Sequence, residues 1–237
     1  MCFLSRKTAE SEIINVMRKT KEEMLITREK IIQAGFDCFF HNGFEATSLT
    51  AVAQAAGVTR GAIYWHFEDK KALYRSVVDY TIERADITEF AKNQSPDLGY
   101  TERLADLFWY ALDNNPHVEF IFKALNFASS NEEFHDVVEK IQRVKRKLWE
   151  FLDVETKVFL RMHGKTPEGE ETNIMASTLS LMFEGMFLAK NVNVGIQLDK
   201  DYIYRYTALV TAAIVQDVMP NRWEKMRASI IGLAKSS

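Results

Sequence analysis

Apolar residues recur at intervals of three and four along most of the chain, and this spacing places them on one face of an α-helix. No stretch alternates between apolar and polar residues over the length of a strand. Proline, which interrupts helices, occurs only at Pro96, Pro116, Pro167 and Pro220. Because 47% of the residues are apolar, the helices can bury an ordinary globular core. The pattern therefore predicts an all-α protein.

The first long helix is expected over about residues 22–42. Ile31 and Cys38 lie on its apolar side, and Gly43 is suited to the left-handed conformation in which helices commonly end. The polar, mixed residues 1–21 are expected to form an N-terminal arm, either frayed or the start of this helix.

Two very short helices follow, joined by a tight turn. Thr47-Ser48 and Thr59 offer side-chain oxygens that cap their first turns. Between them, Gly57 has no Cβ and can take the positive φ that a helix-to-helix reversal often requires. Asp69 is expected to cap a fourth helix. The apolar residues expected to face the core are Leu49, Val52, Ala53, Ile63, Leu73, Val77 and Val78.

The later part of the chain predicts longer helices, separated by ordinary turn residues. We expect three parts: an N-terminal arm over 1–21, a domain of short helices over 22–85 and a larger domain over 86–237. The helices expected in the larger domain cover 101–114, 117–128, 131–163, 171–193, 199–218 and 221–234.

The charge distribution permits an anionic partner without requiring one. The formal net charge is −3. Residues 1–85 contain twelve Lys and Arg against eleven Asp and Glu, whereas the remainder contains eighteen against twenty-two. The first third is thus slightly positive and the rest mildly acidic, which is compatible with nucleic-acid binding at the N-terminal side.

The cysteines and the hydropathy pattern indicate the cellular compartment in which the protein is expected. With only Cys2 and Cys38 the chain has no disulfide framework, and Cys38 is interpreted as a core residue. No run of about 18 apolar residues predicts a membrane span. A reducing, cytoplasmic location is therefore expected.

Two short helices joined by a glycine-containing turn are typical of the helix-turn-helix, whose second helix enters the major groove of DNA. The side chains after the turn suit that role. Thr59 can donate to a phosphate, and Arg60 can bind a phosphate or the O6/N7 edge of guanine. Gly61 leaves room where the backbone approaches DNA. Tyr64, Trp65 and His66 have polar tips suited to phosphate, sugar or thymine-methyl contacts.

Each of these residues alone is weak evidence for DNA binding, because an isolated Thr-Arg-Gly or Trp-His sequence usually lies on the protein surface and has no binding function. Aromatic residues here also occur in cores, and Phe67 is assigned to the core. Their combination with two capped helices and a glycine turn at the right spacing favours DNA binding.

The segment TSLTAVAQAAGVTRGAIYWHFEDK, from Thr47 to Lys70, resembles the DNA-binding domain of TetR-family repressors, and most of all the AcrR-like branch that controls multidrug efflux pumps. Arg18–Glu22 and Thr27-Arg28 also fit that branch. Glu68 departs from it, since the branch often has a neutral or basic residue there. The resemblance implies DNA contacts by Ser48, Thr59, Arg60, Gly61, Tyr64, Trp65, His66 and Lys70.

The larger domain contains no nucleotide-binding, metalloprotease or nucleophile motif, so an enzyme is not expected, nor a cofactor or metal. Its aromatic and methionine residues suit either a packed core or an apolar ligand site. The resemblance, whose members bind inducers here, favours a ligand site. Glu184 interrupts an apolar run and could attract a cationic ligand, face solvent or pair across a dimer. The residues expected to line the site are Phe108, Trp109, Leu112, Phe120, Phe127, Trp149, Met182, Phe183, Glu184, Met186 and Phe187.

A dimer is expected from the last long helices. Helix 171–193 is apolar on more than one face, and helix 199–218 has an apolar stripe. The family pairs such helices around a two-fold axis, which matches a palindromic operator. The predicted interface residues are Tyr206, Leu209, Val210, Ala213 and Ile214.

The expected function is a ligand-responsive repressor, released from double-stranded operator DNA when a small apolar or amphipathic inducer binds. An efflux-pump operon is the expected target. The alternatives are an activator or global regulator on the same scaffold, a regulator of a metabolic operon, or an interaction protein with a vestigial helix-turn-helix.

Overall fold

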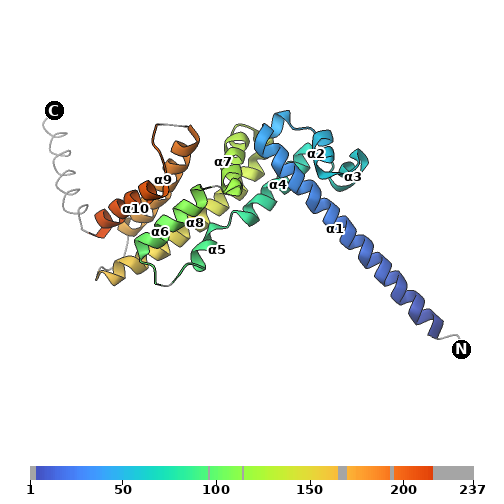
Figure 1. The fold of residues 1–237 in the computed structure, drawn as a ribbon, viewed down its shortest axis with the longest axis horizontal. Coiled ribbons are helices and arrows are strands. Elements are labelled where there is room, and N and C mark those ends of the chain that lie inside the picture. The colour runs from blue at the N-terminus through green and yellow to red at the C-terminus, as the bar shows by residue number, and fades with distance from the viewer. Residues whose placement is uncertain (1–3, 96, 114, 165–169, 193–194, 216–237) are drawn as a thin grey trace. The chain divides into compact units, whose positions relative to one another are not determined.

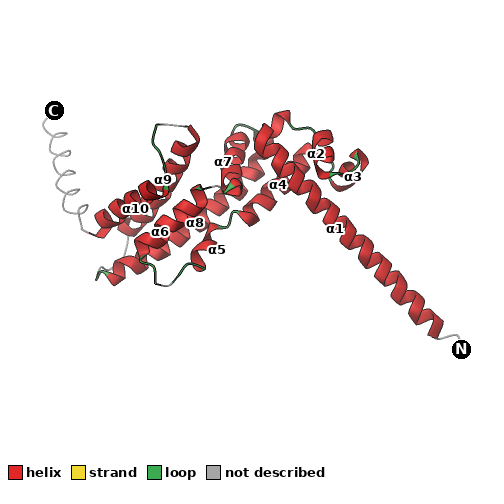
Figure 2. Cartoon of the chain, in the orientation of Figure 1, coloured by secondary structure: helices red, strands yellow, loops and turns green. Residues whose placement is uncertain are grey.

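The computed structural model describes residues 4–95, 97–113, 115–164, 170–192 and 195–215. Throughout these ranges the regular elements are helices joined by loops, which confirms the all-α prediction (Figure 2). The chain forms two compact units. The first consists of the residues up to Arg84 together with Phe120–Glu132, and the second of Ala85–Glu119 and the residues from Glu133 onward.

The first unit begins with α1 (Leu4–Ala46), which is longer than predicted (Figure 1). Of the two alternatives for residues 1–21, the structure has the start of this helix, from Leu4 onward, rather than a frayed arm, so the helix begins earlier than residue 22. No glycine or proline occurs before Gly35 to end a helix. At the other end, Gly43 has φ 76° and ψ 174°, so the helical conformation is interrupted there, as predicted. The short helices α2 (Leu49–Ala56) and α3 (Arg60–His66) and the longer α4 (Lys70–Arg84) follow.

Helices α1 and α4 form the centre of this unit. Ile31, Leu73 and Val77 are fully buried between them. Gly35 lets the helices approach closely, since a Cβ built on it would lie 3.1 Å from Cγ2 of Val77. Cys38, predicted as core, is only half-buried and is a free thiol.

The predicted caps of the short helices are all present. The Ser48 hydroxyl accepts a hydrogen bond from the Ala51 amide at 3.1 Å, and the Thr59 hydroxyl accepts one from Ala62 at 3.2 Å. Gly57 ends α2 with φ 66°, the left-handed conformation. Asp69 accepts from the Ala72 amide at 2.7 Å at the start of α4. The turn between α2 and α3 is therefore fixed by local chemistry at both of its ends.

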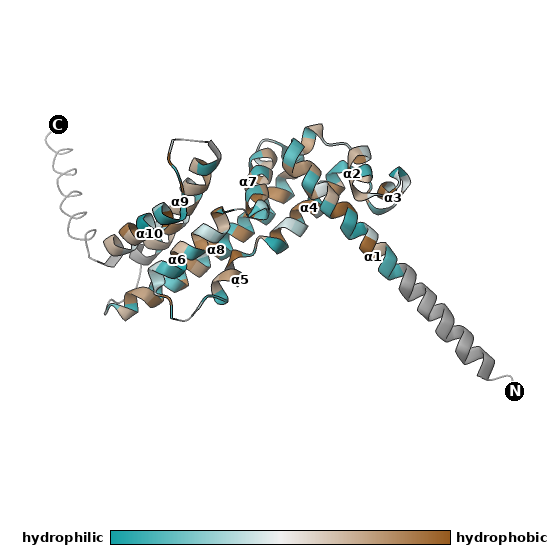
Figure 3. Ribbon diagram, in the orientation of Figure 1, coloured by the Kyte–Doolittle hydropathy of each residue, from teal (hydrophilic) through white to brown (hydrophobic). Residues whose placement is uncertain are grey.

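The second unit contains α5 (Ile87–Lys92), α6 (Tyr100–Leu112), the first residues of α7 (Pro116–Ser129), a 3₁₀ turn over Glu132–Phe134, α8 (His135–Met162), α9 (Glu170–Val192) and α10 (Lys200–Val215). Helices α6 and α8 contain both hydrophobic and hydrophilic residues, as expected of amphipathic helices (Figure 3). Helix α8 packs on α9, and α6 packs on α10. The expected helix over 221–234 lies outside the described residues.

Two details of the second unit differ from prediction. Helix α5 was missed, because its six residues are too few to show periodicity. The helix expected from residue 131 starts with a separate 3₁₀ turn. The rest of the order agrees. Asn115 caps α7, since its side-chain oxygen accepts from the amides of His117 and Val118.

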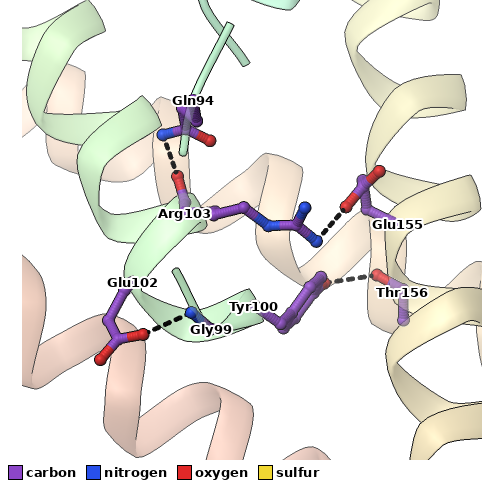
Figure 4. Close-up of polar contacts among 7 residues, drawn as sticks. All are labelled: Gln94, Gly99, Tyr100, Glu102, Arg103, Glu155 and Thr156. Atoms are coloured by element: carbon purple, nitrogen blue, oxygen red, sulfur yellow. Dashed lines mark hydrogen bonds and ion pairs between the residues drawn. The ribbon is translucent and has the colours of Figure 1, made fainter. Parts of the chain in front are cut away.

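Polar contacts fix the start of α6 against α8 (Figure 4). The Tyr100 hydroxyl lies 2.9 Å from that of Thr156, and Arg103 pairs with Glu155 at 3.0 Å. Burial raises the pKa of Tyr100 to about 12, so the phenol stays neutral, and either hydroxyl can donate to the other. Gln94 also donates to the Arg103 carbonyl at 2.9 Å. The loop before α6 is thereby tied to the helix.

The position of α7 was not foreseen. Its residues from Phe120 onward belong to the first unit, although they were expected in the larger domain. The domain boundaries over 22–85 and 86–237 stay a prediction. In the structure, the first unit also includes Phe120–Glu132.

The two glycines near the turn provide a test of its geometry. Gly57→Ala should lower the free energy of unfolding by about 1 kcal/mol, because the left-handed conformation is costly for a residue with a Cβ. Space is not the cause, since a Cβ there would meet nothing within 4 Å. Urea denaturation measures the change.

Gly61→Ala is the matched control. Gly61 has no left-handed conformation, and its Cβ would lie 3.9 Å from the Thr59 hydroxyl, an ordinary contact. Stability should be unchanged or rise by up to about 1 kcal/mol, since alanine favours helix. Equal stability of the Gly57→Ala protein and the wild type would show that the turn is not strained.

Candidate nucleic-acid interface

Helix α3 has one buried side and one exposed aromatic side. Ile63 is fully buried in the first unit. The next two residues point outward, with Tyr64 49% and Trp65 66% exposed. A large aromatic side chain left this exposed on a capped helix is suited to a binding partner.

The start of α3 offers polar groups. Thr59, Arg60 and Gly61 are exposed, as the sequence predicted. The Arg60 guanidinium lies 5.9 Å from the Tyr64 ring centroid, one turn further along the helix. This contact aligns a cation and a phenol on the same face. Ser48, also exposed, lies at the start of α2.

Arg28 of α1 is a neighbour of this surface that the sequence did not identify as a site residue. Its guanidinium lies 5.1 Å from the Phe67 ring centroid, and its Nη2 donates to Ser76 of α4 at 3.1 Å. It thus connects α1, the end of α3 and α4. Its hydrogen-bond partner is 48 residues away, so no local pattern could have revealed it.

The environment of His66 affects its charge. The imidazole is half-buried at the end of α3. Burial, and then the positive charge of Arg28, lower the pKa of His66 below its ordinary value. The side chain is therefore neutral at neutral pH in the free protein.

Lys70 has internal partners in this structure. Its ammonium donates to the carbonyls of Phe44 at 2.8 Å and Glu45 at 3.2 Å, and it lies 4.3 Å from the Phe44 ring centroid. These contacts satisfy carbonyls at the end of α1. Its expected phosphate contact stays a prediction, beside this structural role.

The residues expected to line a ligand site fall into two groups. Phe120 and Phe127 lie in the first unit, among aromatic rings of α1 and α4. Their place in one ligand site with the others stays a prediction. The remaining residues lie in the second unit. Those buried are Phe108, Leu112, Met182, Phe183, Met186 and Phe187, and those half-buried are Trp109 and Trp149.

The second-unit group is well packed. Phe108 stacks with Phe183 at 5.5 Å between centroids, and Trp149 donates to Ser177 at 3.2 Å. Glu184 forms an ion pair with Lys145 of α8 at 2.9 Å. This intrachain ion pair differs from the three alternatives that were considered for Glu184.

Most of the residues predicted for a dimer interface are exposed to solvent. Leu209 is 67% exposed, Tyr206 and Ala213 are exposed, and Val210 is half-buried. The side chain of Ile214 lies outside the described ones. Groups of three or more potential metal ligands are absent from the described residues, and so is a helix long and apolar enough to cross a membrane.

Curated relatives match part of this chain. ArpR of Pseudomonas putida, named a probable HTH-type transcriptional regulator, is 41% identical over 83 residues, which are 35% of this chain and 40% of that protein. TtgR of P. putida, another HTH-type transcriptional regulator, is 45% identical over 71 residues, 30% of this chain and 34% of its own length. AcrR of Shigella flexneri is 50% identical over 60 residues, 25% of this chain and 28% of its own. The matches thus span two fifths or less of these relatives.

Solved structures extend the likeness to the fold of most of the chain. A TetR-family regulator from Cytophaga hutchinsonii covers 80% of this chain and 96% of its own, with a TM-score of 0.64 and 19% identity. A TetR regulator from Chloroflexus aurantiacus covers 82% and 97%, with a TM-score of 0.63 and 18% identity.

The family described as bacterial regulatory proteins, tetR family, matches residues 31–77, which include α2, α3 and the packed parts of α1 and α4. The relatives are named as regulators, which supports the expectation that the chain is not an enzyme. The chain is therefore TetR/AcrR-like: its residues 31–77 match the tetR family, and its all-α fold is that of solved TetR-family regulators.

Proposed function

We propose that the chain is a homodimeric transcriptional repressor that binds a palindromic operator through α2 and α3. A small apolar or amphipathic molecule, bound by the second unit, releases it. A multidrug efflux operon is the proposed target. The observation that carries the proposal is the surface of α3, where Tyr64 and Trp65 are exposed beside Arg60 on a helix fixed by caps at its start and by Ile63 beneath.

The proposed contacts divide by chemistry. Arg60 is suited to a guanine edge or a phosphate, and Thr59 and Ser48 to phosphates. Tyr64 and His66 are suited to phosphates, and Trp65 to a sugar or a thymine methyl group. Gly61 allows the backbone to approach. Such side chains give affinity through phosphates and specificity through bases.

Exposed apolar residues on α9 and α10 support dimerisation. On α9, Ile174 is 56%, Leu181 68% and Leu188 61% exposed, and they recur every seven residues. On α10, Tyr206 and Leu209 are exposed. A monomer rarely leaves such stripes in water, and two helices per chain can form a four-helix interface around a two-fold axis.

The repressor role and the efflux target are supported by likeness alone. BepR of Brucella suis is named a transcriptional repressor, and an Escherichia coli relative is named a probable acrEF/envCD operon repressor. Release requires the inducer to bind more tightly to the conformation that does not fit DNA. The second unit has aromatic and methionine residues suited to apolar molecules, such as Phe183 and Met186.

Alanine substitutions test the DNA contacts. Arg60→Ala and Tyr64→Ala should each weaken binding to a duplex of the chain's own promoter region by tenfold or more, since a specific contact is worth about 1–3 kcal/mol. Fluorescence anisotropy measures the affinity.

Both variants should unfold within about 0.5 kcal/mol of wild type in urea, because these side chains are exposed. The control is Ile63→Ala, which removes a fully buried side chain and should cost about 2–5 kcal/mol. Unchanged DNA affinity in both surface variants would favour a vestigial helix-turn-helix.

His66 gives the complex a pH dependence. In free protein its pKa is lowered, whereas a nearby phosphate favours the charged imidazole and raises the pKa in the complex. The complex then holds more protons than its parts, so DNA affinity should rise as the pH falls from about 8 to about 6. Titration at fixed ionic strength measures this, and His66→Gln should flatten the profile. If DNA affinity depended on pH identically in the wild type and the His66→Gln protein, His66 would not contact a phosphate.

A charge on α10 tests the dimer. Leu209→Glu should give a monomer in analytical ultracentrifugation and weaken binding to the palindrome. Val154→Glu is the matched control, because Val154 of α8 is also apolar and 57% exposed but lies outside the proposed interface. A dimeric Leu209→Glu protein, or dissociation by both changes, would exclude this interface.

A further inference from the structure

The end of α1 has carbonyls that its own helix does not satisfy. Because Gly43 departs from helical geometry, the regular hydrogen bonding of α1 is broken over its last turn. Two lysines distant in sequence fill this gap. Lys70 of α4 donates to the Phe44 and Glu45 carbonyls, and Lys123 of α7 donates to the Phe40 carbonyl at 3.3 Å.

Helix α7 also supplies rings around this helix end. Phe120 lies 5.3 Å from Phe36 between ring centroids. Phe127 lies 4.9 Å from Phe44. Both rings also contact Tyr74 of α4, at 6.1 and 5.7 Å. All these residues belong to the first unit, so α7 is packed into the DNA-binding part of the molecule.

Lys123 holds the last turn of α1 in two ways. Besides its hydrogen bond, the ammonium lies 4.0 Å from the Phe40 ring centroid. A cation is favoured at a helix C-terminus and over an aromatic face. The same side chain therefore satisfies a carbonyl and contacts the ring of the same residue.

The last turn of α1 leads directly to α2. Thr47 is buried, and its hydroxyl donates to the Gly43 carbonyl at 2.7 Å. The next residue, Ser48, caps α2, and Gly57 then sets the turn to α3. A shift at the end of α1 is therefore passed to α2 and α3 through a short, hydrogen-bonded path.

We propose that Phe120, Lys123 and Phe127 of α7 are positioning residues for DNA binding. They act through the end of α1 and do not contact DNA. These residues lie outside the matched segment 31–77, yet they pack in the same compact unit as that segment. The DNA readout rests on the proposed function, but the positioning itself is also measurable without DNA.

The first experiment compares Lys123→Met with Lys123→Arg in the full chain. Methionine keeps much of the side-chain volume but loses the charge and the donor. It should weaken binding to the promoter duplex about five- to tenfold, the effect of losing one charged hydrogen bond and one cation–π contact. Arginine should restore affinity to within about twofold, because it keeps both interactions. Lys147→Met, at an exposed residue of α8, is the matched control and should bind as wild type does.

Salt dependence separates positioning from direct contact. If Lys123 only positions α1, Lys123→Met should leave the slope of log affinity against log salt unchanged. Loss of a phosphate contact would instead reduce that slope by about 0.9. A reduced slope, or wild-type affinity of Lys123→Met, would overturn the proposal.

Hydrogen exchange tests the same claim without DNA. Lys123→Met should speed amide exchange over residues 40–52 at least about fivefold, while exchange in α8 stays unchanged. In wild type, promoter DNA should slow exchange over 120–129, because coupling between two sites is reciprocal. Unchanged exchange over 40–52 would overturn the positioning role even if DNA binds. A wild-type protein that binds no DNA would instead contradict the proposed function.

Discussion

A helix of seven residues is not stable in water by itself, so the surface of α3 depends on what holds that helix. Thr59 accepts a hydrogen bond from an amide in the first turn of α3, and Gly57 sets the turn that leads into it. The buried side chain of Ile63 packs α3 onto the core. Beneath it, α1 and α4 approach closely at Gly35. The side chains proposed to contact DNA thus project from a rigid support, which lowers the entropy lost on binding.

Local chemistry explains how much could be predicted. Caps and turns depend on residues a few positions apart, so Ser48, Gly57, Thr59 and Asp69 were assigned correctly from sequence. Helix order followed from periodicity. The start of α1 was left open, because residues 4–21 are polar and lack a packing pattern, although no residue there ends a helix.

Contacts between distant segments could not be predicted in the same way. The predicted stripe of α1 faces α4, but Phe36 and Phe40 also contact residues of α7. Residues 36–44 are dense in aromatic side chains, which is the one signal that α1 has a second partner. The sequence could not show that Phe120 and Phe127 of α7 are the rings that contact Phe36 and Phe44. Pairing of Lys145 with Glu184 across α8 and α9 was equally invisible in sequence.

The central claim is that two copies of α3 read two half-sites of one operator. Hydroxyl-radical footprinting of the chain's own promoter region tests it most directly. Two protected patches are expected, whose centres lie about 34–36 Å apart, one helical turn, and both should disappear with Arg60→Ala. A promoter without protected sites, or protection that persists in the Arg60→Ala protein, would contradict it.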